Sequence, residues 1–282
     1  MEYNALIEQL LSSYKQIFAQ QVELGSLSSW AQHKKSDSNE LVRPSIPFVG
    51  KNYALQKTKI LLYASAENLS NYTEEKGGWL DDDAKAINRH RLYFDKNKET
   101  EFFPNVHIAP ISDGSLLIVL RYICEKLAID LPNNPKDFLD CIAFANFGKF
   151  SIEVKDGVNK DYANDKTLLD NSMEYVKMDI SLLQPDIIVM FKSIYSTEKC
   201  EIDAIKGGGR VICTYQINAR TVNLVIHKKY QPKDVKELSG TLQDWFDIKH
   251  FNKNKFTNKT HANFLSVFTY LDQVIEAHLN QQ

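Results

Sequence analysis

The sequence predicts an α/β protein: a three-layer α/β/α sandwich in which helices cover both faces of a central, mostly parallel sheet of four to five strands. Two observations predict this fold class. Several short segments are apolar almost without interruption, as strands buried on both faces are. Longer segments around them carry apolar residues every three or four positions, as on one face of a helix. This alternation is typical of a parallel sheet with helical crossovers.

The predicted strands are short and apolar. The first, Ile60 to Tyr63, lies in KTKILLYASAEN (57–68) and leads into small and polar residues, so we expect a strand followed by a polar loop. The other predicted strands are FLDCIAFANF (138–147), PDIIVMF (185–191) and RVICTY (210–215), with TVNLVIH (221–227) as a candidate fifth.

Helices are predicted at both ends of the chain and between the strands. Residues 3–22 carry an apolar stripe that includes Leu6, Leu10 and Tyr14. Residues 25–50 mix Gly, Ser, Asp, Asn and two Pro, which is typical of a long connection. The remaining predicted helices are 113–127, the segment from Leu169 to Leu183 before Pro185, and a final helix with Phe264, Phe268, Leu271 and Ile275.

A single domain is predicted over residues 1–282, because no internal repeat or low-complexity tract divides the chain. Within it we expect an N-terminal helix and connection (1–50), an α/β core (51–230) and a C-terminal helical extension (231–282).

Composition and charge exclude several classes of protein. With 43% hydrophobic and 25% charged residues, the chain is neither disordered nor a disulfide scaffold. Its formal charge of −2 gives no global positive field that would draw it onto nucleic acid or acidic lipid, so such contacts need a local patch. The longest apolar runs, at 116–120 and 187–191, are too short to span a bilayer, and no signal-like segment is seen, so we expect a cytoplasmic protein without a membrane partner.

No metal site and no cofactor are predicted. The four cysteines, Cys124, Cys141, Cys200 and Cys213, show no C-x-x-C spacing, and we expect reduced thiols. The run Asp81 to Asp83 precedes a basic segment and is better explained by a helix start than by a metal. Gly207 to Gly209 lacks the Lys-Ser/Thr ending of a phosphate loop and is predicted to be a turn. Neither H-E-x-x-H nor G-x-S-x-G occurs, so metalloprotease and serine-hydrolase functions have no support.

Polar residues that follow the predicted strands are the candidates for a functional site, because ligands of parallel sheets bind at the carboxyl ends of the strands. Each also has a structural explanation as a turn residue or a solvated side chain. The segment 249–261, with four Lys and two Phe, would suit phosphates and unstacked bases or form a solvated loop. The strand-end candidates are Ser65, Glu67, Asn68, Asn146, Lys149, Tyr215, Gln216, Asn218 and Arg220.

Five of these segments, in order over roughly residues 57–228, resemble motifs of the uracil-DNA glycosylase superfamily, most nearly its iron–sulfur branch. KILLYASAEN resembles the first motif, and PISDGSLLIVLRYICEKL resembles the segment downstream of it. IAFANFGKFS resembles a strand followed by N-x-x-K, LLQPDIIVMFKS resembles the next strand, and VICTYQINAR resembles the late T-Y-H-P-x-A motif.

The resemblance implies an enzyme that flips a base out of the stack and hydrolyses its N-glycosidic bond. Asn146 would read the base, Glu67 would position water, and Gln216 would donate a hydrogen bond to the base oxygen on which negative charge develops. The other residues expected to contact the substrate are Ser65, Asn68, Ile111, Phe147, Lys149, Tyr215, Asn218 and Arg220.

The chain departs from the family pattern at several of these positions. Gln216 stands at the His position and cannot carry charge, which could cost on the order of 10²–10³ in rate. Ser65 stands where Glu is common, and Glu67 where Pro is common. Ile111 stands at the aromatic stacking position, for which Phe147, Tyr72 or Tyr63 could substitute. The cluster cysteines are absent at the family spacings, so no iron–sulfur cluster is expected.

Three functions therefore remain open. The first is a base-excision glycosylase. The second is a catalytically degenerate relative that binds a nucleobase, nucleotide or nucleic acid, in a cleft at the carboxyl ends of the strands, without turnover. The third is a module that contacts a protein partner through its terminal helices.

Overall fold

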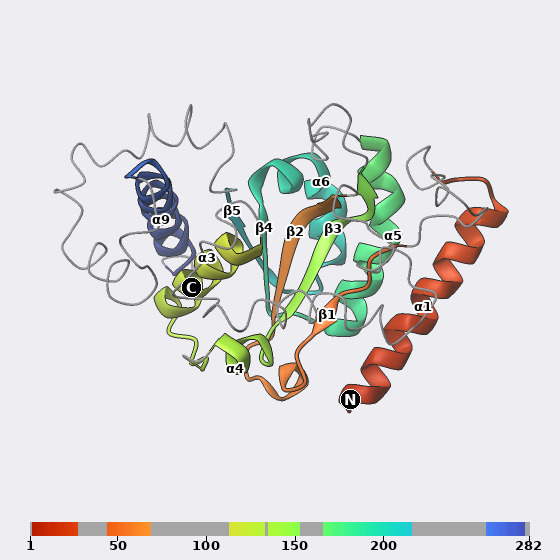
Figure 1. The fold of residues 1–282 in the computed structure, drawn as a ribbon, viewed down its shortest axis with the longest axis horizontal. Coiled ribbons are helices and arrows are strands. Elements are labelled where there is room, and N and C mark those ends of the chain that lie inside the picture. The colour runs from red at the N-terminus through yellow and green to blue at the C-terminus, as the bar shows by residue number, and fades with distance from the viewer. Residues whose placement is uncertain are drawn as a thin grey trace. The chain divides into compact units, whose positions relative to one another are not determined.

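The computed structural model describes residues 2–27, 44–68, 113–132, 135–152, 166–215 and 258–279. Within them a five-stranded sheet has the order β1-β3-β2-β4-β5 (Figure 1). β2 pairs in parallel with β3 and with β4, whereas β1 pairs antiparallel with β3. This mixed, mostly parallel sheet with its helices confirms the predicted α/β class. The strands are β1 (Phe48–Val49), β2 (Ile60–Asn68), β3 (Ala143–Ile152), β4 (Ile187–Phe191) and β5 (Arg210–Thr214).

Helices lie where the sequence predicts them over residues 3–22, 113–127 and 169–183 and at the end of the chain, whereas the helix start expected at Asp81 to Asp83 lies outside the described residues. The described helices are α1 (Tyr3–Glu23), the 3-10 turn η1 (Tyr53–Leu55), α3 (Asp113–Lys126), α4 (Pro135–Leu139), α5 (Lys166–Leu183), α6 (Lys192–Ile205) and α9 (Asn258–Leu279). The apolar pattern of the sequence did not predict α6, which follows β4 directly. Its buried residues are Ile194, Glu198 and Ile202, and the acid among them interrupts the apolar stripe.

The chain forms two compact units, each built from two separate stretches. The first comprises Met1–Leu92 and Leu139–Val211, and the second comprises Tyr93–Phe138 and Ile212–Gln282. The prediction of a single domain stays a prediction.

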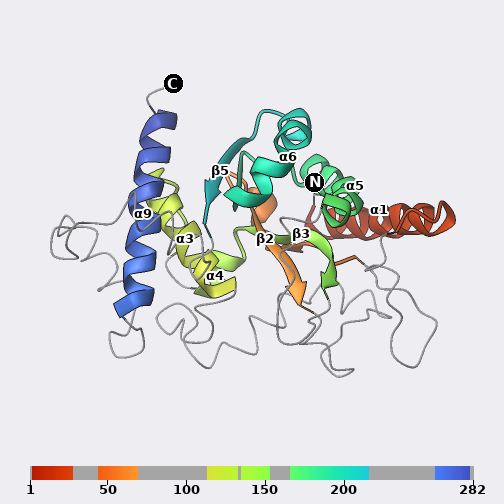
Figure 2. The same cartoon turned by 90° about the horizontal axis from the view of Figure 1, so that it is seen from above.

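In the first unit, α5 and α6 pack against the strands, and α1 packs against α5. α5 contacts β3, α6 contacts both β4 and α5, and α1 contacts α5. Figure 2 shows α5 and α6 along one face of β2 and β3, with α1 on the outer side of α5. The strands beneath bury Leu61, Leu62 and Ile188 completely. The apolar stripe predicted for α1 is also buried, at Leu6 and Leu10.

In the second unit, α3 and α9 pack against each other. The rings of Tyr122 and Phe268 stack with their centroids 4.0 Å apart. The Tyr122 hydroxyl donates a 2.7 Å hydrogen bond to Asp272 Oδ1, and Lys126 Nζ lies 2.9 Å from the same oxygen. An apolar stripe and a polar rim therefore hold this helix pair together.

Two strands differ from their predicted boundaries. β2 continues to Asn68, so Ser65, Glu67 and Asn68 belong to the strand and not to a loop after it. The segment predicted as a strand over 138–147 begins in α4, and β3 runs from Ala143 to Ile152. Asn146 therefore lies inside the strand. The reason is the long parallel pairing of β2 with β3, whose hydrogen bonds outweigh the turn preference of individual polar residues.

Other boundaries are closer to expectation. The predicted connection 25–50 contains β1, which is too short to show a periodicity. Gly207 and Gly208 adopt positive φ angles of 58° and 95° in the turn before β5, as the glycine run predicts. The candidate strand 221–227 lies outside the described residues.

Among the helices that the structure describes, none has the length and apolar character needed to cross a bilayer.

The four cysteines differ in burial, and this predicts their reactivity. Cys124 and Cys141 are buried, whereas Cys200 is exposed on α6. Burial raises the pKa of the Cys124 thiol to about 12, so it stays protonated at pH 8, whereas the thiolate is the reactive form. At pH 8 we expect iodoacetamide to modify Cys200 in the native protein and to modify Cys124 only after unfolding, as measured by peptide mass spectrometry. Equal labelling of both in the native protein would contradict the packing of α3.

Candidate functional site

Asn146, the predicted base-reading residue, is buried inside the sheet. It lies in β3 directly opposite Ala64 of the neighbouring strand β2. Its exposed fraction is 4%. An amide in such a place keeps a donor and an acceptor where little water competes for them.

Strand alternation separates Asn146 from two other predicted residues. Successive side chains of a strand point to opposite faces of the sheet. Lys149 reaches Asp179 on α5, and the Phe147 ring packs edge-on to Tyr63, with centroids 5.6 Å apart. Phe147 and Lys149 therefore lie on the face that α5 covers, and Asn146 lies on the opposite face. Tyr63 and Phe147, proposed as substitutes for the stacking ring, do not share a face with Asn146.

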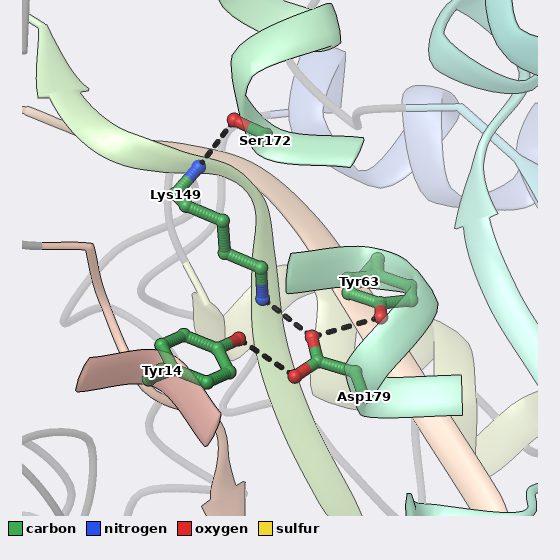
Figure 3. A network of polar contacts seen from close by, with 5 residues as sticks. All are labelled: Tyr14, Tyr63, Lys149, Ser172 and Asp179. Atoms are coloured by element: carbon green, nitrogen blue, oxygen red, sulfur yellow. Dashed lines mark hydrogen bonds and ion pairs between the residues drawn. The ribbon is translucent and has the colours of Figure 1, made fainter. Parts of the chain in front are cut away.

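Lys149 forms a buried ion pair instead of facing solvent. Its Nζ lies 2.5 Å from Asp179 Oδ2, and neither side chain has any exposed surface. Two tyrosine hydroxyls complete the hydrogen bonding of the carboxylate: Tyr14 of α1 donates to Oδ1 at 2.6 Å, and Tyr63 of β2 donates to Oδ2 at 3.0 Å (Figure 3). One carboxylate thus joins α1, β2 and β3 to α5.

The Lys149 ammonium is also bordered by aromatic rings. Its Nζ lies 5.6 Å from the centroid of the Tyr14 ring and 5.3 Å from that of Tyr63. The negative faces of such rings attract a cation and replace part of its lost hydration. The ammonium therefore has both an anion and two rings around it.

The pKa directions follow from this burial. Burial, and then the adjacent Asp179 carboxylate, raise the pKa of Tyr14 and Tyr63 above the usual value, so both hydroxyls stay protonated and donate. Burial lowers the pKa of Lys149 and raises that of Asp179, while the attraction between the two opposes both shifts. Either group alone in this place would therefore be costly to keep charged.

A second set of contacts ties the end of α1 to α5. The rings of Tyr14 and Tyr175 lie 4.9 Å apart, and the Tyr175 hydroxyl donates to Gln21 Oε1 at 2.7 Å. Gln21 Nε2 donates in turn to the carbonyl of Asn171, whose own side chain donates to the carbonyl of Ser26. The side of α1 that faces α5 is therefore matched to it by polar as well as apolar contacts.

The remaining predicted residues lie elsewhere. Ser65 is half-buried in β2, on the same face as Tyr63 by alternation. Tyr215 belongs to the second unit, where its ring packs edge-on to Tyr270 at 4.9 Å. The backbones of Glu67 and Asn68 belong to β2, but their side chains are not described. Ile111, Tyr72, Gln216, Asn218, Arg220, residues 81–83 and residues 249–257 lie outside the described residues, so their roles stay predictions.

Two residues of this region, Ser172 and Asp179, were not among the candidates predicted from the sequence. Both occupy positions on the buried apolar stripe of α5, beside Leu169 and Val176. A charged or hydroxyl side chain at such a position requires a buried partner. The presence of these polar residues on an apolar helix stripe was the signal in the sequence that could have pointed to them, although it does not identify the partner.

Comparison of the chain with protein-family models, with curated proteins and with solved structures finds no match. Within the described ranges, no three His, Cys, Asp or Glu side chains are grouped so that they could hold a metal ion.

The stability of the ion pair can be tested with a double-mutant cycle. Lys149→Met and Asp179→Leu each leave one buried charge without its partner, and we expect each to lower the free energy of unfolding by about 3–5 kcal/mol. The double variant replaces the pair by apolar side chains and is expected to lose much less than the sum of the two. Urea unfolding followed by circular dichroism measures all three.

Lys177→Met is the matched control on α5, because Lys177 pairs with Glu174 at 2.9 Å at the surface, where the two side chains are 38% and 59% exposed. We expect it to change stability by less than about 1 kcal/mol. Additive losses in the cycle would show that Lys149 and Asp179 do not interact.

Proposed function

We propose that this chain recognises a nucleobase through the Asn146 amide and hydrolyses the N-glycosidic bond of a damaged or deaminated base. The observation that carries the proposal is the burial of this amide in a parallel strand, opposite the small side chain of Ala64. An Asn amide offers one acceptor and two donor hydrogens, which complement the Watson–Crick edge of a base. The order of the sequence motifs supports the same assignment.

The proposed reaction needs three groups. Asn146 holds the base, and Glu67 orients a water molecule whose oxygen bonds to the anomeric carbon. The electron pair of the broken carbon–nitrogen bond passes to the base, which leaves as an anion and then takes up a proton. Gln216 donates a hydrogen bond to the base oxygen as this charge develops. The roles of Glu67 and Gln216 rest on the resemblance alone.

One observation favours binding without turnover as the second candidate. Lys149 is the nearest cation to Asn146 in the sequence, yet its charge is matched by Asp179. Because Gln216 is a neutral amide and the charge of Lys149 is already paired, neither residue supplies a free positive charge for an anionic leaving base. A protein that binds a nucleobase and does not release it by hydrolysis would fit this charge distribution.

The N-terminal helix α1 gives little support to a protein-interaction module. Leu6, Leu10 and Tyr14 of its apolar stripe are buried, and the exposed large apolar side chains are Val22 in its last turn and Leu24 just after it. Two such side chains form a smaller apolar surface than stable protein interfaces use. On α9, Leu279 at the helix end is exposed as well.

The proposed activity is tested with single- and double-stranded oligonucleotides that carry uracil, hypoxanthine, xanthine or an alkylated base. Alkaline cleavage then reveals abasic sites. We expect cleavage by the wild type and a loss of at least about 10²-fold in Asn146→Ala, because the base is no longer held in place. Asn4→Ala, a change at an exposed residue of α1, is the matched control and should cleave normally.

Fluorescence anisotropy with the same oligonucleotides distinguishes the two candidates. Binding without cleavage, lost in Asn146→Ala, would favour the non-catalytic candidate, and Gln216→His should then restore some cleavage. If the wild type neither binds nor cleaves any substrate while a control glycosylase does, both candidates are wrong.

A further inference from the structure

β3 carries a bulge that begins after Gly148, two residues beyond Asn146. The parallel pairing with β2 is regular up to Ala66 opposite Gly148, but the next pair is Asn68 opposite Ile152. While β2 advances from 66 to 68, β3 advances from 148 to 152, so β3 carries the extra residues. Bulges bend a strand and change the direction of the side chains beside them.

The backbone of Lys149 lies in this bulge, and both of its polar groups find partners outside β2. Its N–H donates to Ser172 Oγ on α5 at 2.9 Å, and its carbonyl accepts from the N–H of Ser45 at 2.7 Å. Ser172 is fully buried, so water cannot replace its oxygen as the acceptor. The bulge is therefore fixed by specific contacts.

α5 holds Lys149 at two points. Ser172 and Asp179 lie about two turns apart on the same face of the helix. One binds the main-chain nitrogen of Lys149, and the other binds the ammonium at the end of its side chain (Figure 3). Between this anchored residue and Asn146 lie only Phe147 and Gly148, so the anchor sets where the preceding backbone can lie.

We propose that the anchored bulge fixes the orientation of the Asn146 amide, and that Ser172 is a positioning residue for base recognition. The assignment of a base to Asn146 rests on the proposed function; the orientation of the amide does not. Ser172 lies on the opposite side of β3 from the Asn146 side chain and acts only through the backbone of residues 146–149. Without the Ser172 hydroxyl oxygen, the Lys149 N–H loses that acceptor, and the bulge can shift.

The first test needs no ligand. In protein labelled with ¹⁵N-asparagine, the side-chain NH₂ signals of Asn146 are identified by their absence from Asn146→Ala. We expect these signals to move in Ser172→Ala and to stay in place in Ser196→Ala, a change at an exposed serine of α6. If Ser172→Ala does not fold, Ser172→Cys replaces it, because its sulfur fills the space of the hydroxyl but is only a weak acceptor. Unchanged Asn146 signals would overturn the proposal.

The second test measures affinity for two oligonucleotides, one with a single uracil and one with an abasic site at the same position. Ser172→Ala should weaken binding of the uracil oligonucleotide by between about tenfold and 10²-fold, as a small misplacement of a recognition group does. It should leave binding of the abasic oligonucleotide unchanged. In an Asn146→Ala background it should have no further effect, because a residue that acts through Asn146 loses its influence there.

The outcomes separate the two proposals. If Asn146→Ala weakens uracil binding and Ser172→Ala does not, the proposed function stands and the positioning role is wrong. If Ser172→Ala weakens both oligonucleotides equally, its role is structural and the positioning role is again wrong. If the Asn146 signals move in Ser172→Ala but the wild type binds neither oligonucleotide, the geometric effect of the bulge stands and the proposed recognition of uracil is wrong.

Discussion

The packing of the first unit depends on the buried carboxylate of Asp179. It accepts hydrogen bonds from Tyr14, Tyr63 and Lys149, and so joins α1, β2 and β3 to α5 at one point. A buried pair of this kind need not add net stability, since removing both charges from water is costly. Its effect is to fix how α1 and α5 dock on the strands. Any docking of α1 or α5 that failed to bring the three donors to Asp179 would leave a buried charge without partners, at a cost of several kcal/mol.

The two faces of β3 have different roles. Lys149 and Phe147 face α5 and contribute to the packing of the unit. Asn146, which directly precedes Phe147, faces the other side of the sheet. A candidate recognition group is thus carried on a strand whose other face is held by an ion pair and aromatic rings. Rigid support of this kind is what a recognition amide needs, because hydrogen-bond discrimination depends on placement within a fraction of an ångström.

The features of the fold that could be predicted from the sequence are those that local patterns of residues determine. Apolar runs and helical stripes predicted α1, α3, α5, α9 and the strands β2 to β5, because the side chain at each position favours or opposes burial. The composition of residues 64–68 suggested a loop, yet they pair with β3, and no local pattern records a partner strand. The same limit applies to Lys149: its spacing from Asn146 suggested one shared site, but β3 continues beyond its predicted end, and alternation along it separates the two side chains. The roles of Glu67 and Gln216 were predicted from the resemblance, and the described residues do not test them.

The most direct test of this account is native-state hydrogen exchange in Tyr14→Phe, which removes one hydroxyl and leaves the ring. A hydrogen bond to a buried carboxylate contributes about 1.5–3 kcal/mol, so the amides of α1 should exchange roughly ten to a hundred times faster than in the wild type. The amides of α3 and α9, in the other unit, should keep their protection. Unchanged protection in α1, or an equal loss across all helices, would contradict the claim that the Asp179 carboxylate holds α1 in place.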